Sequence, residues 1–421
     1  MKIDTKCCQE GWKPKNGEPR VLPIYQSTTF KYDTSEDMGD LFDLKVPGYF
    51  YTRLANPTSG YVEQKISALE GGVGCMLTAS GQSANLAAIL NIAQAGDHIV
   101  SSSSIYGGTY NLIAVSIKKM GIETTFIPPD SDYDTICKAI RPNTRLIFGE
   151  TLANPALTVL DIETFAKAAH DNNIPLVVDN TFPTPINCRP IEWGADIVTH
   201  ATTKYMDGHG TIVGGAVVDS GNFDWTKGNY PELTEPDESY HGLVYTEAFG
   251  KAAFYNKCVT GVMRDLGISP SPFNSFLLNM GLETLHLRME RHNKNGLAVA
   301  QYLKNHPKIA WVKYPGLEDD PGYELAQKYM PNGQSGVVSF GVDGSKEDAI
   351  KIINNLKLIT IVTHVATLTS CCLHPASATH RQLSDEALKA CGVPPELIRL
   401  SIGIEDIDDI IADIDQAIAK I

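Results

Sequence analysis

The sequence has few of the features that mark secreted, membrane or nucleic-acid-binding proteins. Its first residues have no apolar core of the kind that a secretory signal needs, and no run of about 18 apolar residues occurs. Its 35 lysines and arginines are outnumbered by 49 aspartates and glutamates, which gives a formal net charge of −14. This balance argues against nucleic acid or an anionic membrane as a partner. We therefore expect a cytoplasmic protein with small-molecule ligands.

Several local signatures are also missing. The nine cysteines are scattered without C-x-x-C spacing, so neither a disulfide framework nor a zinc site is indicated. There is no H-E-x-x-H pattern, and His374 and His380 are poorly spaced for helical metal ligands, so we expect no metal. A non-catalytic α/β nucleotide-binding protein is an alternative from another functional class. The lack of a G-x-G-x-x-G turn or a Walker pattern disfavours it.

The order of patterns along the 421 residues predicts an arm and two α/β domains. Residues 1–60 have too little apolar periodicity for a core of their own, although residues 22–30 have a strong extended signal, so we expect an arm lying on another surface. Residues 61–268 alternate helix and strand patterns, which predicts a mostly parallel sheet covered on both faces. Two prolines near residue 270 mark the start of a smaller α/β domain at 269–421. We expect its first helix to be one long helix at 276–303. The strands we expect lie at residues 98–100, 124–127, 146–148, 176–178, 195–198, 215–219, 336–341 and 397–402.

One lysine and one aspartate stand where two of these strands end. Lys204 lies on a turn after the apolar run 195–198, and Asp179 directly follows the run 174–178. In open α/β sheets, ligands bind at the carboxyl edge of the strands. A lysine there suits a Schiff base with pyridoxal phosphate, whose pyridine nitrogen needs an acidic partner. Most lysines and aspartates are only solvated surface residues, but their positions at strand ends favour the functional interpretation.

A strand-to-helix junction at Ser80, Gly81 and Gln82 is a candidate phosphate site. Free backbone N–H groups and the helix dipole at such a junction favour an anion. The alternative is an ordinary helix cap, because serine is a common N-cap residue. With Lys204 in the same chain, we favour phosphate binding.

Taken together, the segments around these residues resemble the Cys/Met-metabolism family of pyridoxal-phosphate enzymes, and within it the O-acetylhomoserine sulfhydrylases. The resemblance runs almost end to end, and the order and spacing of its segments make it specific. It implies the fold-type I (aspartate-aminotransferase-like) α/β architecture, with a mostly parallel large domain and a smaller C-terminal domain. The segments that carry it are Tyr51-Thr-Arg53-Leu-Ala-Asn-Pro-Thr58, Ala79-Ser-Gly-Gln82, Ile105-Tyr-Gly-Gly108, Glu150-Thr-Leu-Ala-Asn-Pro155, Val178-Asp-Asn-Thr181, Val198 to Thr211, His374-Pro-Ala-Ser-Ala-Thr-His380 and Arg399-Leu-Ser-Ile-Gly403.

The resemblance implies roles for further residues. Tyr106 matches a tyrosine that stacks on the cofactor ring and helps the γ-leaving group depart. Asn154 matches an asparagine on the cofactor's phenolic oxygen. Tyr51 and Arg53 match an arm pair that binds the phosphate of a neighbouring subunit, with Tyr51 also near the substrate.

Two further matches concern the substrate carboxylate and the phosphate. Arg399 matches the arginine that holds the substrate α-carboxylate, and Thr203 a phosphate donor. His364 lies near the sequence position at which relatives have a Ser or Asn beside that carboxylate. The sequence also differs from its relatives at two other positions. These are Ala201, where many relatives have serine, and Gly108, where methionine γ-lyases have cysteine.

The activity implied by the resemblance is pyridoxal-phosphate-dependent γ-replacement in methionine biosynthesis. Sulfide or a thiol replaces the acetoxy group of O-acetyl-L-homoserine, which leaves as acetate, and gives homocysteine or methionine. γ-Elimination, as in methionine γ-lyase or cystathionine γ-lyase, is the alternative. We also expect a homo-oligomer, with dimers that share active sites and pair into tetramers.

Overall fold

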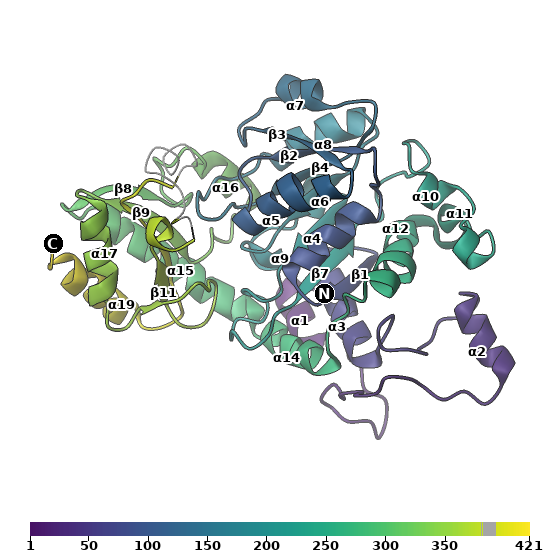
Figure 1. Ribbon diagram of the computed structural model, residues 1–421. Helices are drawn as coiled ribbons and strands as arrows, with labels where there is room; N and C mark the ends of the chain where they lie inside the picture. Colours follow the sequence, from purple (N-terminus) through teal and green to yellow (C-terminus); the bar gives the residue numbers. More distant parts are fainter. Residues whose placement is uncertain (380, 382–392) are drawn as a thin grey trace.

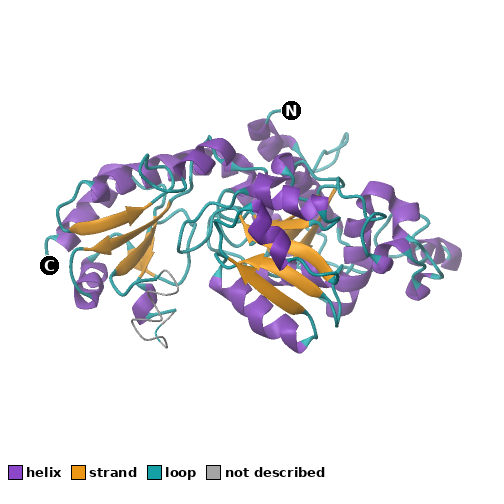
Figure 2. Cartoon of the chain, turned by 90° about the horizontal axis from the view of Figure 1, so that it is seen from above, coloured by secondary structure: helices purple, strands orange, loops and turns teal. Residues whose placement is uncertain are grey.

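The computed structural model describes residues 1–379, 381 and 393–421. His380, the last residue of one segment quoted above, lies outside the described residues. Two β-sheets organise the described chain, one with seven strands and one with five. They form separate groups of strands, and helices cover them (Figures 1 and 2).

The seven-stranded sheet is mostly parallel, as expected. Its order is β1-β7-β6-β5-β4-β2-β3, and only β7 runs antiparallel to its neighbours. β2, β4, β5, β6 and β7 are buried along their whole length, which is typical of strands covered on both faces. The strands are β1 (Gly74–Thr78), β2 (His98–Ser102), β3 (Glu123–Ile127), β4 (Thr144–Glu150), β5 (Leu176–Asp179), β6 (Ile197–His200) and β7 (Gly215–Asp219).

Alternating side chains divide the core of this sheet between its two faces. Ile147 and Val178 pack with residues of α3, α8 and α14. Phe148 and Val177 point to the other face, which packs with α4, α12 and the helical run 107–119. Because side chains alternate along a strand, Glu150 and Asp179 lie on the α4 face, with Phe148 and Val177.

Several helices around this sheet begin with a side-chain cap. α3, for example, starts after Asn56, whose side chain accepts from the Thr58 N–H, and ends at Gly71, whose φ is 86°. The α-helices from the amino terminus to residue 266 are α1 (Ile3–Gln9), α2 (Ser35–Phe42), α3 (Pro57–Glu70), α4 (Gly81–Leu90), α5 (Gly107–Asn111), α6 (Ile117–Lys119), α7 (Tyr133–Ala139), α8 (Ile162–Asp171), α9 (Thr184–Asn187), α10 (Pro231–Thr234), α11 (Tyr245–Phe249), α12 (Ala253–Lys257) and α13 (Arg264–Leu266). Two π-helical turns, η1 (Leu112–Ser116) and η5 (Cys258–Met263), interrupt them.

The second sheet is mostly antiparallel and has the order β10-β11-β12-β9-β8. Its core joins residues of the strands to residues of α15, α17 and α19. Its strands are β8 (Ile309–Lys313), β9 (Val337–Val342), β10 (Thr360–Ile361), β11 (Cys371–Leu373) and β12 (Leu397–Ser401). The helices are α14 (Pro272–Glu283), α15 (Leu285–Lys304), α16 (Tyr323–Tyr329), α17 (Lys346–Asn355) and α19 (Ile407–Ile418).

The structure confirms the fold class and corrects four local expectations. The long helix at 276–303 is two helices, α14 and α15, which meet at Thr284, where φ is −109° and ψ is 6°. The extended signal at 22–30 forms no strand, only an isolated bridge between Thr29 and Tyr51. β1 was not among the expected strands, because glycines precede it and it has only three apolar residues. β8, β10 and β11 were also missed, because they are short or partly exposed.

Within the first 60 residues, some segments pack on the large sheet and one helix does not. Cys7 of α1 and Leu22 join the core of the large sheet, whereas α2 stands away from both sheets (Figure 1). The domain boundaries at residues 60 and 268 stay predictions. In the part of the chain that is described, no helix has the length and apolar character needed to cross a bilayer.

Candidate active site

Lys204 lies on the turn that follows β6, at the carboxyl edge of the large sheet. The turn is fixed from outside this sheet. Arg288 of α15 donates to the carbonyl oxygens of Tyr205, at 2.6 Å, and Met206, at 3.4 Å. The hydroxyl of Tyr205 accepts the N–H of Gly336 at 2.9 Å. The position of the lysine therefore depends on both halves of the chain.

The amine of Lys204 is prepared to act as a nucleophile. Burial, with a further contribution from the positive charge of Arg399, lowers its pKa to about 8. Within the described residues, no hydrogen bond or ion pair occupies the amine. A lysine with this pKa is neutral far more often near neutral pH than an ordinary lysine, and only the neutral amine attacks a carbonyl.

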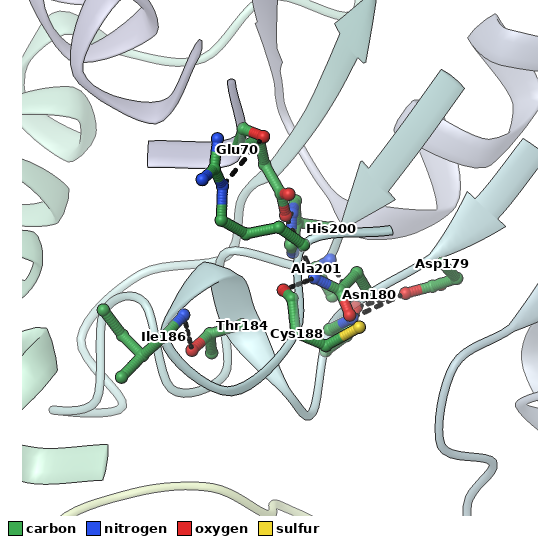
Figure 3. A network of polar contacts seen from close by, with 10 residues as sticks. Glu70, Asp179, Asn180, Thr184, Ile186, Cys188, His200 and Ala201 are labelled. Carbon is green, nitrogen blue, oxygen red and sulfur yellow. Dashed lines mark hydrogen bonds and ion pairs between the residues drawn. The ribbon is translucent and has the colours of Figure 1, made fainter. Parts of the chain in front are cut away.

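Asp179 ends β5, the neighbour of β6 in the sheet. It is only 6% exposed. One of its carboxylate oxygens accepts from the backbone N–H of Thr181 at 3.1 Å and from its hydroxyl at 2.5 Å, and the other accepts from Asn85 at 3.3 Å. The Thr181 hydroxyl in turn accepts the N–H of Ala201 at 2.8 Å, so it links Asp179 to the start of the lysine turn (Figure 3 labels both ends).

Ser80 caps α4, and this part of the alternative interpretation is observed. Its hydroxyl accepts the Ser83 N–H at 3.1 Å, and the Ser83 hydroxyl accepts the Ser80 N–H at 2.9 Å. The N–H groups of Gly81 and Gln82, in the first turn, have no partner within the helix. A Cβ added to Gly81 would lie 2.5 Å from the Cβ of Ala201, so this helix end lies against the lysine turn.

The hydroxyl of Thr203 is engaged within the protein. It donates to the carbonyl of Gly214 at 3.1 Å and accepts the Gly214 N–H at 3.0 Å. A phosphate that used this hydroxyl as a donor would have to compete with Gly214. The side chain of Gln82 accepts from Thr109 at 3.3 Å, next to the same helix end.

Arg399 lies on β12, so the second sheet contributes a residue to the site. Its guanidinium donates to the Asn154 side chain at 3.4 Å and to the His364 carbonyl at 3.0 Å, and its Nε is buried without a partner. Burial, together with the charges of Lys204 and Arg399 and against that of Asp207, lowers the pKa of His364 to about 4. The imidazole is therefore neutral, and its Nε2 is also buried without a partner.

Tyr106 follows β2 and is 49% exposed, so its ring is accessible to a ligand. Tyr51 and Arg53 are placed differently. The Arg53 guanidinium lies 5.1 Å from the centre of the Tyr51 ring on the arm. Across the described residues, no hydrogen bond or ion pair joins either of them to Lys204 or Asp179. Within the described part of one chain, this pair therefore contacts each other and has no bond to the lysine or the aspartate.

Two carboxylates beside the site were missed by reasoning from sequence. Glu150 ends β4 as Asp179 ends β5, and the same strand-end signal would have found it. Glu70 and His200 form a fully buried pair at 2.6 Å under the lysine turn, joined by Asn180 at 3.0 Å (Figure 3). Since Glu70 and His200 are 130 residues apart, no local pattern indicates their contact.

These residues fit pyridoxal phosphate. The group needs an amine free to bond its aldehyde, an acid for its ring nitrogen and donors for its phosphate. Lys204, Asp179 and the start of α4 offer these from three neighbouring elements. The unpartnered buried Nε of Arg399 is a further donor that a carboxylate of a ligand would satisfy.

Comparisons with known proteins agree with this chemistry. A sequence model of the family described as "Cys/Met metabolism PLP-dependent enzyme" matches residues 4–419, where PLP is pyridoxal phosphate. The chain is 45% identical over 411 residues to the O-acetyl-L-homoserine sulfhydrylase of Leptospira meyeri, covering 96% of this chain and 93% of that protein. It is 46% identical over 402 residues to the homocysteine synthase of Schizosaccharomyces pombe, covering 95% and 94%.

A solved structure is similar over the whole chain. The crystal structure of a putative O-acetylhomoserine (thiol)-lyase from Campylobacter jejuni has a TM-score of 0.95 and 36% sequence identity, with full coverage of both chains. That protein contains N'-pyridoxyl-lysine-5'-monophosphate, a lysine joined to the cofactor.

The lowered pKa of Lys204 predicts how cofactor attachment depends on pH. Only the neutral amine attacks, so the rate at which apoprotein bonds pyridoxal phosphate should rise with pH to a midpoint near 8 and level off above it. An ordinary lysine would continue to gain reactivity up to about pH 10.5. Reduction with borohydride at timed intervals, followed by peptide mass spectrometry, measures the modified lysine, and Lys204→Ala provides the blank. A midpoint near 10.5 would contradict the buried, unpaired amine.

Proposed function

The chain belongs to the Cys/Met-metabolism family of PLP-dependent enzymes, and from this premise we propose that it catalyses γ-replacement on O-acetyl-L-homoserine. The bond from Cγ to the acetate oxygen breaks, and a bond from Cγ to sulfur forms. With sulfide the products are homocysteine and acetate, and with methanethiol they are methionine and acetate. The observation that carries the proposal is the Lys204 amine, which is unpaired among the described residues, has a lowered pKa and follows the strand next to the one that ends at Asp179. The names of the relatives from Leptospira and Schizosaccharomyces support the choice of substrate.

Bound pyridoxal phosphate supplies an electron sink, which stabilises negative charge on substrate carbons. In our proposal the carboxylate of Asp179 keeps the proton on the cofactor's ring nitrogen, and Asn154 contacts its phenolic oxygen. The N–H groups of Gly81 and Gln82 bind its phosphate at the start of α4, where the helix dipole favours an anion. Ser80 orients this helix end through its cap and contributes to the same phosphate site, and Thr203 does so when it is released from Gly214.

Lys204 and Tyr106 carry the proton movements in this proposal. The amine of Lys204 would take the proton from Cα and would move this proton and the Cβ proton as the acetate leaves Cγ. A pKa lowered to about 8 suits a group that must both accept and return a proton near neutral pH. Tyr106 offers a flat ring face to the cofactor and a hydroxyl that donates to the leaving group.

The substrate is held by its α-carboxylate. The Arg399 guanidinium donates hydrogen bonds to the Asn154 side chain and the His364 carbonyl, and these bonds orient its unpartnered Nε. A carboxylate can accept from such a planar fork through two bonds. We assign the buried Nε2 of neutral His364 to the same end of the substrate, with Tyr51 of a neighbouring subunit closing over it.

γ-Elimination is the second candidate, because both reactions lose the same group from Cγ and differ in whether sulfur or water ends the sequence. Gly108 favours replacement. A Cβ added there would lie 2.5 Å from Cε1 of the Tyr106 ring and 2.9 Å from Nε2 of Gln82. A cysteine, as in methionine γ-lyases, would therefore move the tyrosine from the place it has in this chain.

Products separate the two candidates directly. With sulfide present, O-acetyl-L-homoserine should give homocysteine and acetate in equal amounts. Without sulfide, turnover should fall by about tenfold or more, since the nucleophile that ends the reaction is missing. Chromatography of homocysteine and 2-oxobutyrate measures both reactions, with Lys204→Ala and Asp179→Asn as inactive controls. Equal 2-oxobutyrate production with and without sulfide would identify a γ-lyase.

Gly108→Ala tests the space around Tyr106. The added methyl group should push the ring aside and lower kcat/KM for replacement on the order of tenfold to a hundredfold, because small misplacements near reacting atoms are costly. Gly107→Ala is the matched control, since a Cβ there has no atom within 4 Å. Sulfide-dependent homocysteine formation measures both variants. If the two variants keep the same activity, the position of the Tyr106 ring does not limit the reaction.

We also propose that the active site is shared between subunits of a dimer, and that dimers pair into tetramers in the cytoplasm. In the described part of one chain, Arg53 makes no hydrogen bond or ion pair with Lys204 or Asp179, which agrees with sharing. α2, which stands away from both sheets, could reach a second copy (Figure 1). In the described residues eight cysteines are free, which agrees with a reducing compartment.

Mixing two inactive variants tests this sharing. Arg53→Ala and Lys204→Ala should each lose activity, and a hybrid dimer should regain one intact site in two. After confirmed subunit exchange in an equal mixture, half of the dimers are hybrids, so activity should recover to about a quarter of the wild-type value. Native mass spectrometry confirms the exchange and reports the dimer and tetramer. Persistent inactivity of the exchanged mixture would place the whole site within one subunit.

A further inference from the structure

Glu150 is a buried carboxyl group to which nothing above assigns a function. It ends β4, which lies between β2 and β5 in the large sheet. It is 6% exposed, and among the described residues it has no ion-pair partner. A buried carboxylate without a cation is expensive, so its retention calls for a physical explanation.

Its contacts lead to three of the residues that we assign to the cofactor. One carboxyl oxygen accepts the backbone N–H of Tyr106 at 2.5 Å, from the segment after β2. The backbone N–H of Asn154 also bonds the carboxyl group. On the other side Glu150 is the register partner of Asp179, so the two side chains lie next to each other on the same face of the sheet.

The ionisation of Glu150 follows from this position. Burial, followed by the charge of neighbouring Asp179, raises the pKa of Glu150 well above its usual value, against the two backbone hydrogen bonds. Two carboxylates side by side do not both ionise easily. Asp179 accepts three hydrogen bonds, two from Thr181 and one from Asn85, and the raised pKa of Glu150 means that this carboxyl group holds a proton more readily than an ordinary glutamate.

We propose that Glu150 is a positioning residue that fixes Tyr106 and Asn154 around the cofactor beside Asp179. This inference rests on the proposed function for the roles of these residues. The reach of the Glu150 side chain matters in this arrangement, because its oxygen must meet the Tyr106 N–H. Its charge does not, because a neutral acid accepts this hydrogen bond and leaves the charge at the ring nitrogen to Asp179.

Two substitutions of Glu150 separate reach from charge. Glu150→Gln keeps the length and an oxygen that accepts, whereas Glu150→Asp keeps the acid and shortens it by one methylene group. Glu150→Gln should bind pyridoxal phosphate within about threefold of the wild type and keep its absorbance spectrum and kcat. Glu150→Asp should bind it about tenfold or more weakly, since a hydrogen bond that positions Tyr106 is lost. Its kcat should also fall, while KM for O-acetyl-L-homoserine changes little.

Asp219 provides the matched control. It is also a buried carboxyl group of this sheet with a raised pKa, and it also accepts two backbone N–H groups, those of Gly221 at 2.9 Å and Tyr255 at 3.1 Å. It pairs with the first residues of β1 and β6, at the opposite edge of the sheet. Asp219→Asn and Asp219→Glu should change thermal stability without changing cofactor affinity or the cofactor spectrum.

Equilibrium titration of each apoprotein with pyridoxal phosphate, followed by absorbance and then by turnover, measures all four variants. The proposal is overturned if Glu150→Asp binds the cofactor as the wild type does, or if Glu150→Gln is the more impaired of the two. It is also overturned if the Asp219 variants lose affinity equally, because the effect would then be general destabilisation. If the wild type binds pyridoxal phosphate but does not convert O-acetyl-L-homoserine, the proposed function fails, and the affinity comparison still tests Glu150.

Discussion

Burial of one lysine amine without a counter-ion is the constraint on which the site depends. Removing a charged amine from water is costly, and the protein avoids most of that cost by letting Lys204 lose its proton at about pH 8. An adjacent carboxylate would restore the ordinary pKa and hold the amine in an ion pair. Asp179 and Glu150 stand instead at the ends of β5 and β4, and the charge with the largest effect on the amine is that of Arg399. The lysine is thus reactive because, among the described residues, no carboxylate pairs with its amine.

The same principle separates the two carboxyl groups at the ends of β4 and β5. Asp179 and Glu150 are register partners on one face of the sheet, and they have similar burial. Their hydrogen-bond partners differ. Asp179 accepts from a hydroxyl, a backbone N–H and an amide, whereas Glu150 accepts from backbone N–H groups and lies beside the charge of Asp179. The pKa of Glu150 is therefore set by its burial and by the neighbouring charge and dipoles, and not by its residue type alone.

The sequence was sufficient for the parts of the fold and site that depend on local patterns. Lys204 and Asp179 could be found because each follows a run of apolar residues, and both runs are buried strands in the structure. The cap of α4 at Ser80 could be found because a serine precedes a helical pattern. The break at Thr284 could not, because apolar residues continue on both sides of it. Contacts such as Arg399 with Asn154, 245 residues apart, depend on how two sheets pack, and only the family resemblance indicated them.

The lysine turn is also a place where the two sheets meet, and this has a consequence for how the site can change. Arg288 of α15 binds the carbonyl groups of Tyr205 and Met206, and the Tyr205 hydroxyl binds Gly336 just before β9. Arg399 comes from β12 of the second sheet and contacts Asn154 after β4 of the first. A rigid shift of the second sheet would therefore move Arg399, where we propose that the substrate carboxylate binds, and would strain the contacts of the lysine turn at the same time. Because buried hydrogen bonds are costly to leave unmade, such a shift has to preserve or replace these contacts, which couples substrate binding to the position of the nucleophile.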